Sequence, residues 1–369
     1  MANKVLVVTK DKMEFNLYQP VVDILEQRGI EVVVVAEGLS MDLWLKAGYE
    51  IYGGLPKEGD FDQKIKTRTD IDPRAVLHQL KPDVVMTGLA DPIHLGESFG
   101  LMANQKEIPL GFVEDLWGVH QRSKALPDFV CTLDSYGDRV IVEDEVYGRY
   151  LPYVYVTGSP AMDTLKSVKP VPEIEAIVKS SGAKRVIIIG GQGEVTTPMI
   201  RGIVELLSVE TFERCLVIPR FHPKWMNDPS KASFKDEWVQ LLSRIKEPHQ
   251  VLWTEPSVNT HSLVLSATEV VSVYSNLLIE AIVLGRIAVS WNSEIGKKKM
   301  KASLGAEEFP LCQLGAVKEV WGVTDYLDRV PTPGTNEYNR LVTTNQEVVL
   351  SDGQNSVRVA DAIREYIYI

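Results

Sequence analysis

The sequence predicts an α/β protein of two domains, each built on a parallel β-sheet covered by helices. Apolar, β-branched runs alternate with amphipathic stretches along the whole chain. A link with two prolines, Lys169 to Pro172, is followed by a fresh apolar run at Arg185–Gly193. The 369 residues, 45% of them hydrophobic, suffice for two cores of ordinary size.

The expected strands of the first half are short apolar runs, several of them bounded by polar or turn residues. They are Val5–Val8, Glu31–Ala36, Asp83–Thr87, Leu110–Val113, Phe129–Leu133, Arg139–Val142 and Tyr153–Thr157. A helical pattern runs from about Leu17 to Arg28 and ends at Gly29, a good C-cap. Another helix is expected after Asp72-Pro73, with the aspartate as its N-cap.

The second half repeats this organisation. After the run at Arg185 its expected strands are Cys215–Pro219, Val251–Trp253, Val270–Tyr274 and Ile287–Ser290. The predicted domains are residues 1–165 and 183–352, with a last helix in 353–369 that packs back on the first domain. Two such domains would face each other across a cleft, and clefts between domains are common ligand sites.

Composition narrows the function classes. The net charge is −11 and the pI is about 5.2, which disfavours nucleic acid and anionic membranes as partners. The three cysteines form no metal-binding or CxxC spacing. The chain starts with a short strand-like run and has no apolar stretch that could span a membrane. The expected location is therefore the cytoplasm, and the oligomeric state is left open.

Three segments of the second domain should meet at one edge of its sheet. They are a glycine turn, a basic loop after a strand, and a Ser-Asn helix start with an acidic residue one turn further on. A helix start is a natural phosphate site, and a carboxylate beyond it can hold ribose hydroxyls. The predicted nucleotide- and sugar-binding residues are Gly190, Gly191, Gln192, Gly193, Arg220, His222, Lys224, Ser275, Asn276 and Glu280. The alternatives are a plain βα turn, a solvated loop and an ordinary helix cap.

Two expected strand ends of the first domain carry groups suited to proton transfer. Asp91 and His94 follow one strand, and Glu114 follows the next. We predict Asp91, Glu114 and His94 as catalytic residues. The alternative is that Asp91 caps a helix and Glu114 is a solvated loop residue.

Metal and cofactor motifs are not found in the sequence. Asp70 and Asp72 match the metal-binding aspartates of some sugar transferases, but Asp72 precedes a proline-started helix and fits a cap better. A phosphate-binding P-loop and a nucleophile elbow are also lacking. We therefore expect no metal and no cofactor.

Several of these motifs resemble those of the GT-B superfamily of sugar-nucleotide enzymes. Val154–Asp163 is similar to its interdomain "VTGN" segment, with Ser159 in place of asparagine. Phe112–Leu116 resembles the "HVEAGLR" strand end of UDP-N-acetylglucosamine 2-epimerases, and His222-Pro223 resembles their "HPN" turn. Ser275 to Ala281 is similar to their diphosphate-binding helix, and lipid A disaccharide synthase is a further likeness.

The resemblance implies a GT-B fold of two Rossmann-like domains. It also implies a metal-independent glycosyltransferase that moves a sugar from a nucleotide-sugar co-substrate, UDP-linked, to an acceptor. The epimerases' arginine-rich segment is replaced by Gly190–Glu194, which a transferase tolerates better. The alternatives are a UDP-N-acetylhexosamine 2-epimerase and a non-catalytic protein that binds sugar nucleotides.

Overall fold

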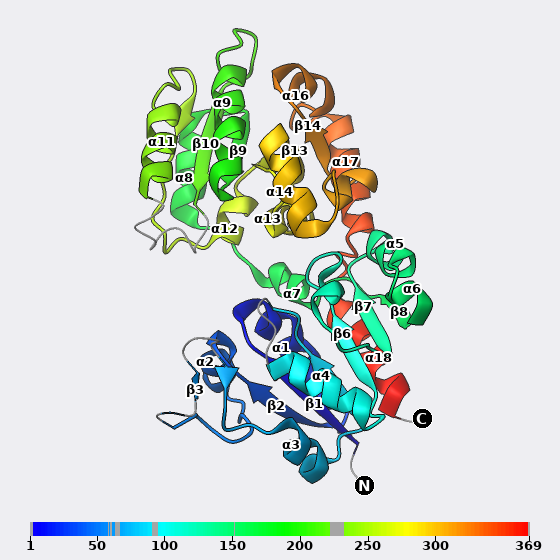
Figure 1. Ribbon diagram of the computed structural model, residues 1–369. Coiled ribbons are helices and arrows are strands. Elements are labelled where there is room, and N and C mark those ends of the chain that lie inside the picture. The colour runs from blue at the N-terminus through cyan, green and yellow to red at the C-terminus, as the bar shows by residue number, and fades with distance from the viewer. Residues whose placement is uncertain are drawn as a thin grey trace. The chain divides into compact units, whose positions relative to one another are not determined.

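The computed structural model describes residues 3–57, 59, 61–62, 67–90, 95–150, 152–221 and 232–367. The chain forms two compact units (Figure 1). The first unit is Met1–Thr164 together with Leu350–Ile369, and the second unit is Leu165–Val349. The first unit is thus made from both ends of the chain, while the second is one continuous segment.

The first unit contains a six-stranded parallel sheet with the strand order β2-β1-β5-β6-β7-β8. The strands are β1 (Lys4–Thr9), β2 (Glu31–Ala36), β5 (Val84–Thr87), β6 (Leu110–Val113), β7 (Phe129–Thr132) and β8 (Tyr153–Val156). A small antiparallel hairpin of β3 (Phe61–Asp62) and β4 (Thr67–Arg68) stands apart from this sheet.

Helices cover both faces of the first sheet, as a buried parallel sheet requires. The helices are α1 (Lys12–Gln27), α2 (Leu39–Lys46), α3 (Pro73–Leu80), α4 (Leu95–Gln105), the 3-10 turn η1 (Val119–Arg122), α5 (Ser135–Glu143), α6 (Tyr147–Tyr150), α7 (Pro160–Asp163) and α18 (Asn355–Ile367). Along β1, Val5 and Val7 pack with α1 and α18, whereas Leu6 and Val8 pack with α3 and α4. This alternation follows from the two-residue period of a strand.

The C-terminal helix α18 belongs to the core of the first unit. Its residues Val359 and Ile363 are fully buried against α1. Asp163, at the end of α7, accepts hydrogen bonds from the backbone N–H groups of Asn355 and Ser356, at 3.2 and 2.7 Å. Gly158 leaves room for the Asn355 side chain, whose Oδ1 would lie 2.3 Å from a Cβ at position 158. The segment at 158–163 therefore anchors the start of α18.

The second unit has a second six-stranded parallel sheet, in the order β11-β10-β9-β12-β13-β14. Its strands are β9 (Arg185–Gly190), β10 (Cys215–Arg220), β11 (Gln250–Val251), β12 (Glu269–Ser272), β13 (Ile287–Trp291) and β14 (Lys318–Val320). The 3-10 turn η2 (Thr164–Ser167) lies at the boundary between the two units. The other described helices and 3-10 turns of the second unit are α8 (Pro172–Ser181), η3 (Gly193–Val195), α9 (Thr196–Leu206), α11 (Ala232–Leu242), α12 (Thr260–Leu265), α13 (Asn276–Val283), α14 (Glu294–Leu304), α15 (Pro310–Gln313), α16 (Val323–Arg329) and α17 (Asn336–Val348).

Both sheets have a point at which the strand order reverses. In the first unit β1 lies between β2 and β5, and in the second β9 lies between β10 and β12. Connections leave such a central strand toward opposite faces, so a crevice opens outside the carboxyl ends of the strands. The β1–β5 and β9–β12 edges are thus the expected ligand sites of the two units.

The predicted α/β class and the parallel sheets are confirmed. One predicted strand is wrong, because residues 139–142 lie in helix α5. The Asp134 side chain caps that helix by accepting hydrogen bonds from the N–H groups of Tyr136 and Gly137. A strong N-cap thus outweighs the β-propensity of a short apolar run. Helix α1 also starts at Lys12, earlier than predicted, and continues through Pro20.

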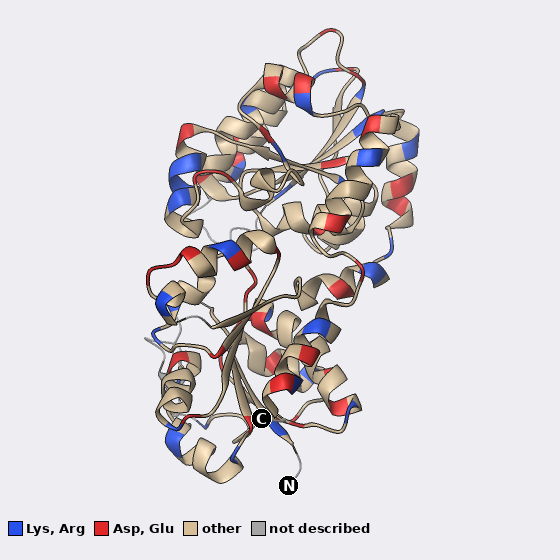
Figure 2. Ribbon diagram, turned by 90° about the vertical axis from the view of Figure 1, so that its right-hand side faces the viewer, with Lys and Arg blue, Asp and Glu red and all other residues tan. Residues whose placement is uncertain are grey.

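The surface charge is mixed in both units, with acidic and basic residues interspersed along the helices (Figure 2). In the part of the chain that the structure describes, no helix combines the length and the apolar character needed to cross a membrane.

Candidate active site

The side chain of Gln192 joins the two loops at the reversal point of the second sheet. Its Oε1 accepts a hydrogen bond from the backbone N–H of Tyr274 at 2.8 Å, and its amide nitrogen donates to the Tyr274 carbonyl. Ser272 Oγ lies 3.1 Å from the same Oε1 and 2.8 Å from the carbonyl oxygen of Gly190. The predicted glycine turn and the start of α13 are therefore held together.

The glycines of this turn have packing roles. A Cβ on Gly190 would lie 3.0 Å from the Leu277 side chain, and one on Gly191 would lie 2.2 Å from the Trp238 ring. Gly193 has a φ of +79°, a left-handed conformation that glycine adopts easily. The first two glycines thus let the turn fit against α13 and α11, and their predicted contact with a nucleotide stays a prediction.

Helix α13 starts at the same edge of the sheet. The side chain of Ser275 caps it by accepting a hydrogen bond from the N–H of Leu277 at 3.2 Å. Asn276 is its first residue, and the Asn276 Oδ1 is buried and has no hydrogen-bond partner within the described ranges. The N-terminal N–H groups of α13 carry the positive end of the helix dipole. Ser275 and Asn276 therefore lie where an anionic group would be stabilised.

Glu280 lies about one turn into α13 and contacts a residue that the sequence did not single out. Its carboxylate is 3.0 Å from His261 Nε2 on helix α12. Both side chains are partly buried, with 17% of the glutamate and 30% of the histidine exposed. Asn259 caps α12 and accepts the His261 backbone N–H at 2.8 Å. The pair is therefore held by two helices that begin at the same edge.

Arg220, at the end of β10, holds the loop that leads into α12. Its guanidinium donates to Thr254 Oγ1 at 3.0 Å, to the Val258 carbonyl at 2.8 Å and to Thr260 Oγ1 at 3.1 Å. It also donates to the carbonyls of Glu255 and Pro256. Burial lowers the pKa of Arg220 from its usual value. The structure thus gives Arg220 a role in positioning the loop, and its predicted contact with the nucleotide or sugar stays a prediction.

Two other predicted contacts of this loop, His222 and Lys224, lie outside the described residues. The lysine-rich run that follows β13 is part of α14. Lys299 pairs with Glu194 at 3.0 Å, and Lys297 and Lys301 both pair with Glu307. These lysines have acidic partners on the surface of the second unit.

In the first unit, Glu114 directly follows β6 and is buried with a histidine. Glu114 Oε1 lies 2.6 Å from His120 Nδ1, and Thr132 Oγ1 donates to Glu114 Oε2 at 3.0 Å. The His120 ring stacks edge-on against Tyr147, and its Nε2 is buried without a hydrogen-bond partner among the described residues. Glu114 and His120 are 1% and 0% exposed, respectively. The geometry is that of a carboxylate orienting an imidazole, so His120 is the residue through which Glu114 would act.

The other two predicted catalytic residues, Asp91 and His94, lie outside the described residues. Asp115, next to Glu114, is the neighbouring acidic group. Burial raises the pKa of Asp115 to about 6, while the positive charge of Arg122 opposes this shift.

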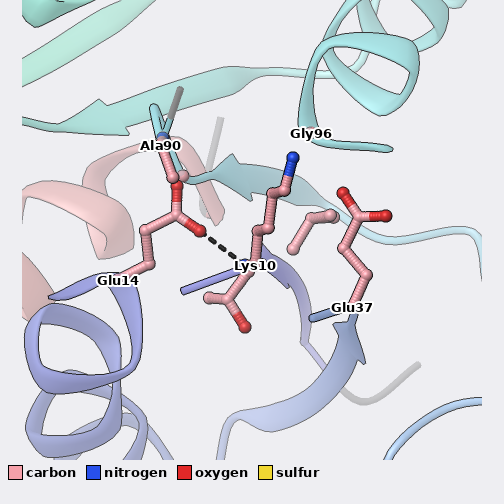
Figure 3. A pocket seen from close by; sticks show the side chains of 8 residues that line it. Lys10, Glu14, Glu37, Ala90 and Gly96 are labelled. Atoms are coloured by element: carbon pink, nitrogen blue, oxygen red, sulfur yellow. Dashed lines mark hydrogen bonds between the residues drawn. The ribbon is translucent and has the colours of Figure 1, made fainter. Parts of the chain in front are cut away.

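A small pocket lies at the reversal point of the first sheet (Figure 3). It has room for about one water-sized group. Its lining residues are Val8, Thr9, Lys10, Glu14, Glu37, Gly88, Ala90 and Gly96. Figure 3 shows the Lys10 side chain running between the two glutamates toward Gly96. The sequence carries one signal for this site, the Asp11-x-x-Glu14 capping box.

Potential metal ligands do not gather within the described ranges, where no group of three His, Cys, Asp or Glu side chains could hold an ion. Asp72 caps α3 through a 3.0 Å hydrogen bond from the N–H of Arg74, as predicted. Asp70 instead binds the Arg68 guanidinium, and this hydrogen bond lowers the pKa of Asp70.

Comparison with solved structures establishes the architecture. S. aureus MnaA, solved with UDP, has a TM-score of 0.64 and 16% identity over 99% of this chain and 97% of its own. UDP-GlcNAc 2-epimerase of Neisseria meningitidis, solved with UDP-GlcNAc, has a TM-score of 0.60 and 15% identity over 98% and 100%. The chain has the GT-B fold. MurG of Acinetobacter baumannii shares this fold at a TM-score of 0.57 and 15% identity, over 98% and 99%. Neither a family model nor a curated protein sequence matches the chain.

Proposed function

We propose that this protein is a glycosyltransferase of the GT-B fold that uses a UDP-linked sugar without a metal ion. The observation that carries the proposal is the arrangement at the β9–β12 edge. There the Gln192 contacts fix the start of α13, and the Glu280–His261 pair stands one turn further on. A diphosphate on the helix start would leave the ribose hydroxyls near that carboxylate.

In this reaction the second unit binds the donor. The N–H groups at the start of α13 would stabilise the negative charge that develops on the departing diphosphate. Arg220 would act indirectly, through the loop it holds against α12. Two solved structures of the same fold contain UDP or UDP-GlcNAc, which supports this class of donor.

A UDP-N-acetylhexosamine 2-epimerase is the second candidate. It is favoured by the buried Glu114–His120 pair, because an epimerase must move protons at the sugar and needs such a pair. Five solved structures of the same fold are also named as UDP-GlcNAc 2-epimerases, one of them as putative.

Product analysis separates the candidates. The full chain is incubated with UDP-GlcNAc in the presence of EDTA, with and without a pool of hydroxyl-bearing acceptors. A transferase yields UDP and a glycosylated acceptor, whereas an epimerase yields UDP-ManNAc without any acceptor. If the protein binds UDP but forms neither product from any UDP-sugar, both enzymatic proposals are wrong and the protein only binds sugar nucleotides.

A further inference from the structure

The Glu280–His261 pair connects two helices at the β9–β12 edge of the second unit. Oε2 of Glu280, on α13, lies 3.0 Å from Nε2 of His261, the second residue of α12. The two helices pack side by side (Figure 1). Among the residues that the structure describes, His261 is the one side chain that pairs with this carboxylate. The orientation of the Glu280 carboxylate therefore depends on His261.

A helix backbone alone leaves a glutamate carboxylate poorly fixed. The side chain has several rotatable bonds, and holding it in one conformer costs conformational entropy. In Glu280, 17% of the side chain is exposed, so solvent competes with a ligand for its oxygens. A ligand that needs this carboxylate binds more tightly when a neighbouring group has already ordered it.

Helix α12 is held at both ends by arginines. Arg220, at the end of β10, donates at 3.1 Å to Oγ1 of Thr260, the first residue of the helix. Arg286, directly before β13, donates through Nε to the carbonyl of Val264 at 3.2 Å and through a second nitrogen to the carbonyl of Leu265. The last carbonyls of a helix have no partner inside it, and a cation there is favourable. These contacts fix α12 against the sheet.

The position of His261 within α12 is fixed as well. Asn259 caps the helix, and its side chain accepts the N–H of His261 at 2.8 Å. Leu263 and Val264, further along α12, are fully buried in the core. Because a carboxylate accepts hydrogen bonds and does not donate them, the His261 nitrogen that faces Glu280 carries the hydrogen. A donor on a fixed helix thus faces a carboxylate that has several conformers of its own.

The pairing leaves most of the carboxylate open to a ligand. Its two oxygens have about four acceptor positions, and His261 takes about one of them. The others suffice for the two neighbouring hydroxyls of a ribose. A 2′-deoxyribose or 3′-deoxyribose lacks one of these hydroxyls and leaves a partly buried acceptor position unpaired. A site that holds the carboxylate still discriminates against such an analogue, because a fixed acceptor does not turn to solvent for a replacement.

We propose that His261 is a positioning residue that fixes the Glu280 carboxylate for the ribose, and so makes the second unit select ribonucleoside diphosphates over their deoxy analogues. This inference rests on the proposed function, in which Glu280 is the ribose ligand. Arg220 contributes at one further remove, because it holds the start of α12 in place. The choice of nucleotide sugar ring thus depends on a histidine that acts through Glu280.

Isothermal titration calorimetry at one pH, with the full chain and UDP, 2′-deoxy-UDP or 3′-deoxy-UDP, measures this selectivity. The proteins are wild type, His261→Leu, His261→Gln, Glu280→Ala and the double variant of His261→Leu with Glu280→Ala. His78→Leu is the matched control, because His78 is an exposed histidine on α3 of the first unit. Thermal unfolding shows which variants are folded, and His261→Ala replaces His261→Leu if the leucine variant is not.

Wild-type protein and the His78→Leu control should bind UDP roughly 10- to 100-fold more tightly than at least one deoxy analogue, the ratio that one hydrogen bond to a charged group supports. In His261→Leu this ratio should fall below about 5-fold, because UDP binds more weakly while affinity for that analogue stays within a few-fold. His261→Gln should keep most of the ratio, since the glutamine amide donates a hydrogen bond at a similar reach. In the Glu280→Ala background, His261→Leu should change the ratio no further.

The two ideas fail in different ways. If wild-type protein binds no UDP, the proposed function fails, and the role of His261 fails with it. If UDP binds but the wild type discriminates against neither deoxy analogue, only the inference about His261 is overturned. A folded His261→Leu variant that keeps the wild-type ratio also overturns it. So does a variant that loses affinity for UDP and for the deoxy analogues equally, which is the result expected of a purely structural residue.

Discussion

Replacement of Glu280 by alanine should weaken UDP binding by about 1–3 kcal/mol, or roughly 5- to 150-fold in Kd. A hydrogen bond to a charged group contributes about 1.5–3 kcal/mol, and the ribose has two hydroxyls that could donate to this carboxylate. His261 lies 3.0 Å away and would remain in the variant. It could bind one hydroxyl in place of the glutamate, so the lower part of the range is included.

The same substitution should leave the fold intact. The Glu280–His261 pair is partly exposed, so its loss should cost less than about 1 kcal/mol of folding free energy. Alanine also has the highest helix propensity, and position 280 is inside α13. The variant should therefore unfold at close to the wild-type temperature.

Isothermal titration calorimetry with UDP, together with thermal unfolding, checks both statements. Glu205→Ala is the matched control, since Glu205 is an exposed glutamate near the C-terminal end of α9, away from the β9–β12 edge. A double-mutant cycle with His261→Ala measures the coupling between the two residues. Wild-type affinity in a correctly folded Glu280→Ala protein would refute the ribose assignment.

Four further predictions concern the rest of the molecule. Asp91→Asn and Glu114→Gln should each lower the steady-state turnover by about 10²- to 10⁴-fold. Calorimetry should show that the UDP affinity of each variant stays within a few-fold of the wild-type value. Normal turnover in both variants would contradict these catalytic assignments. EDTA should not change turnover, and restoration of lost activity by Mg²⁺ or Mn²⁺ would contradict a metal-independent reaction. Arg185→Leu should destabilise the second unit by about 3–5 kcal/mol in chemical denaturation, because it leaves the fully buried Glu269 without its 2.8 Å ion pair. Folding raises the pKa of Glu14 from 4.5 to about 7. The contribution of Glu14 to the free energy of unfolding is therefore fully present below pH 4.5 and is lost as the pH rises through 7. Wild-type stability should therefore fall relative to Glu14→Gln by on the order of 3 kcal/mol over that range, and parallel pH curves would exclude the raised pKa.

The strands could be predicted because a strand that is buried on both faces appears in the sequence as a short run of apolar residues. The runs at Glu31–Ala36 and Leu110–Val113 match β2 and β6 to the residue. Helix α1 was harder to delimit because Pro20 lies inside it, and a proline normally argues for a helix end. The short strand β14 was missed because it comprises only Lys318–Val320 and two of its three residues are charged.

The candidate site was predictable in position and less so in its contacts. Gly190 and Ser275 come together because Gly190 ends β9, Ser275 follows β12, and both strands end at one edge, which the strand pattern implies. The contact between His261 and Glu280 depends on how α12 packs beside α13, and nothing local in the sequence encodes it. Similarly, Arg220 ends a strand like a phosphate ligand, but only the path of the 254–260 loop shows that its two terminal nitrogens already donate to that loop. The Arg220 Nε is buried and has no partner among the described residues.

The junction of Asp163 with the start of α18 bears on how the chain acquires its structure during synthesis. The first 164 residues emerge from the ribosome before the second unit, yet their sheet lacks the helix that covers α1 until residues 355–367 have been made. The second unit, an uninterrupted segment, has its whole core available earlier. The apolar face of the N-terminal half therefore stays uncovered until α18 has been synthesised. A stop codon shortly before Asn355 would remove α18 and so destabilise the half of the chain that is translated first.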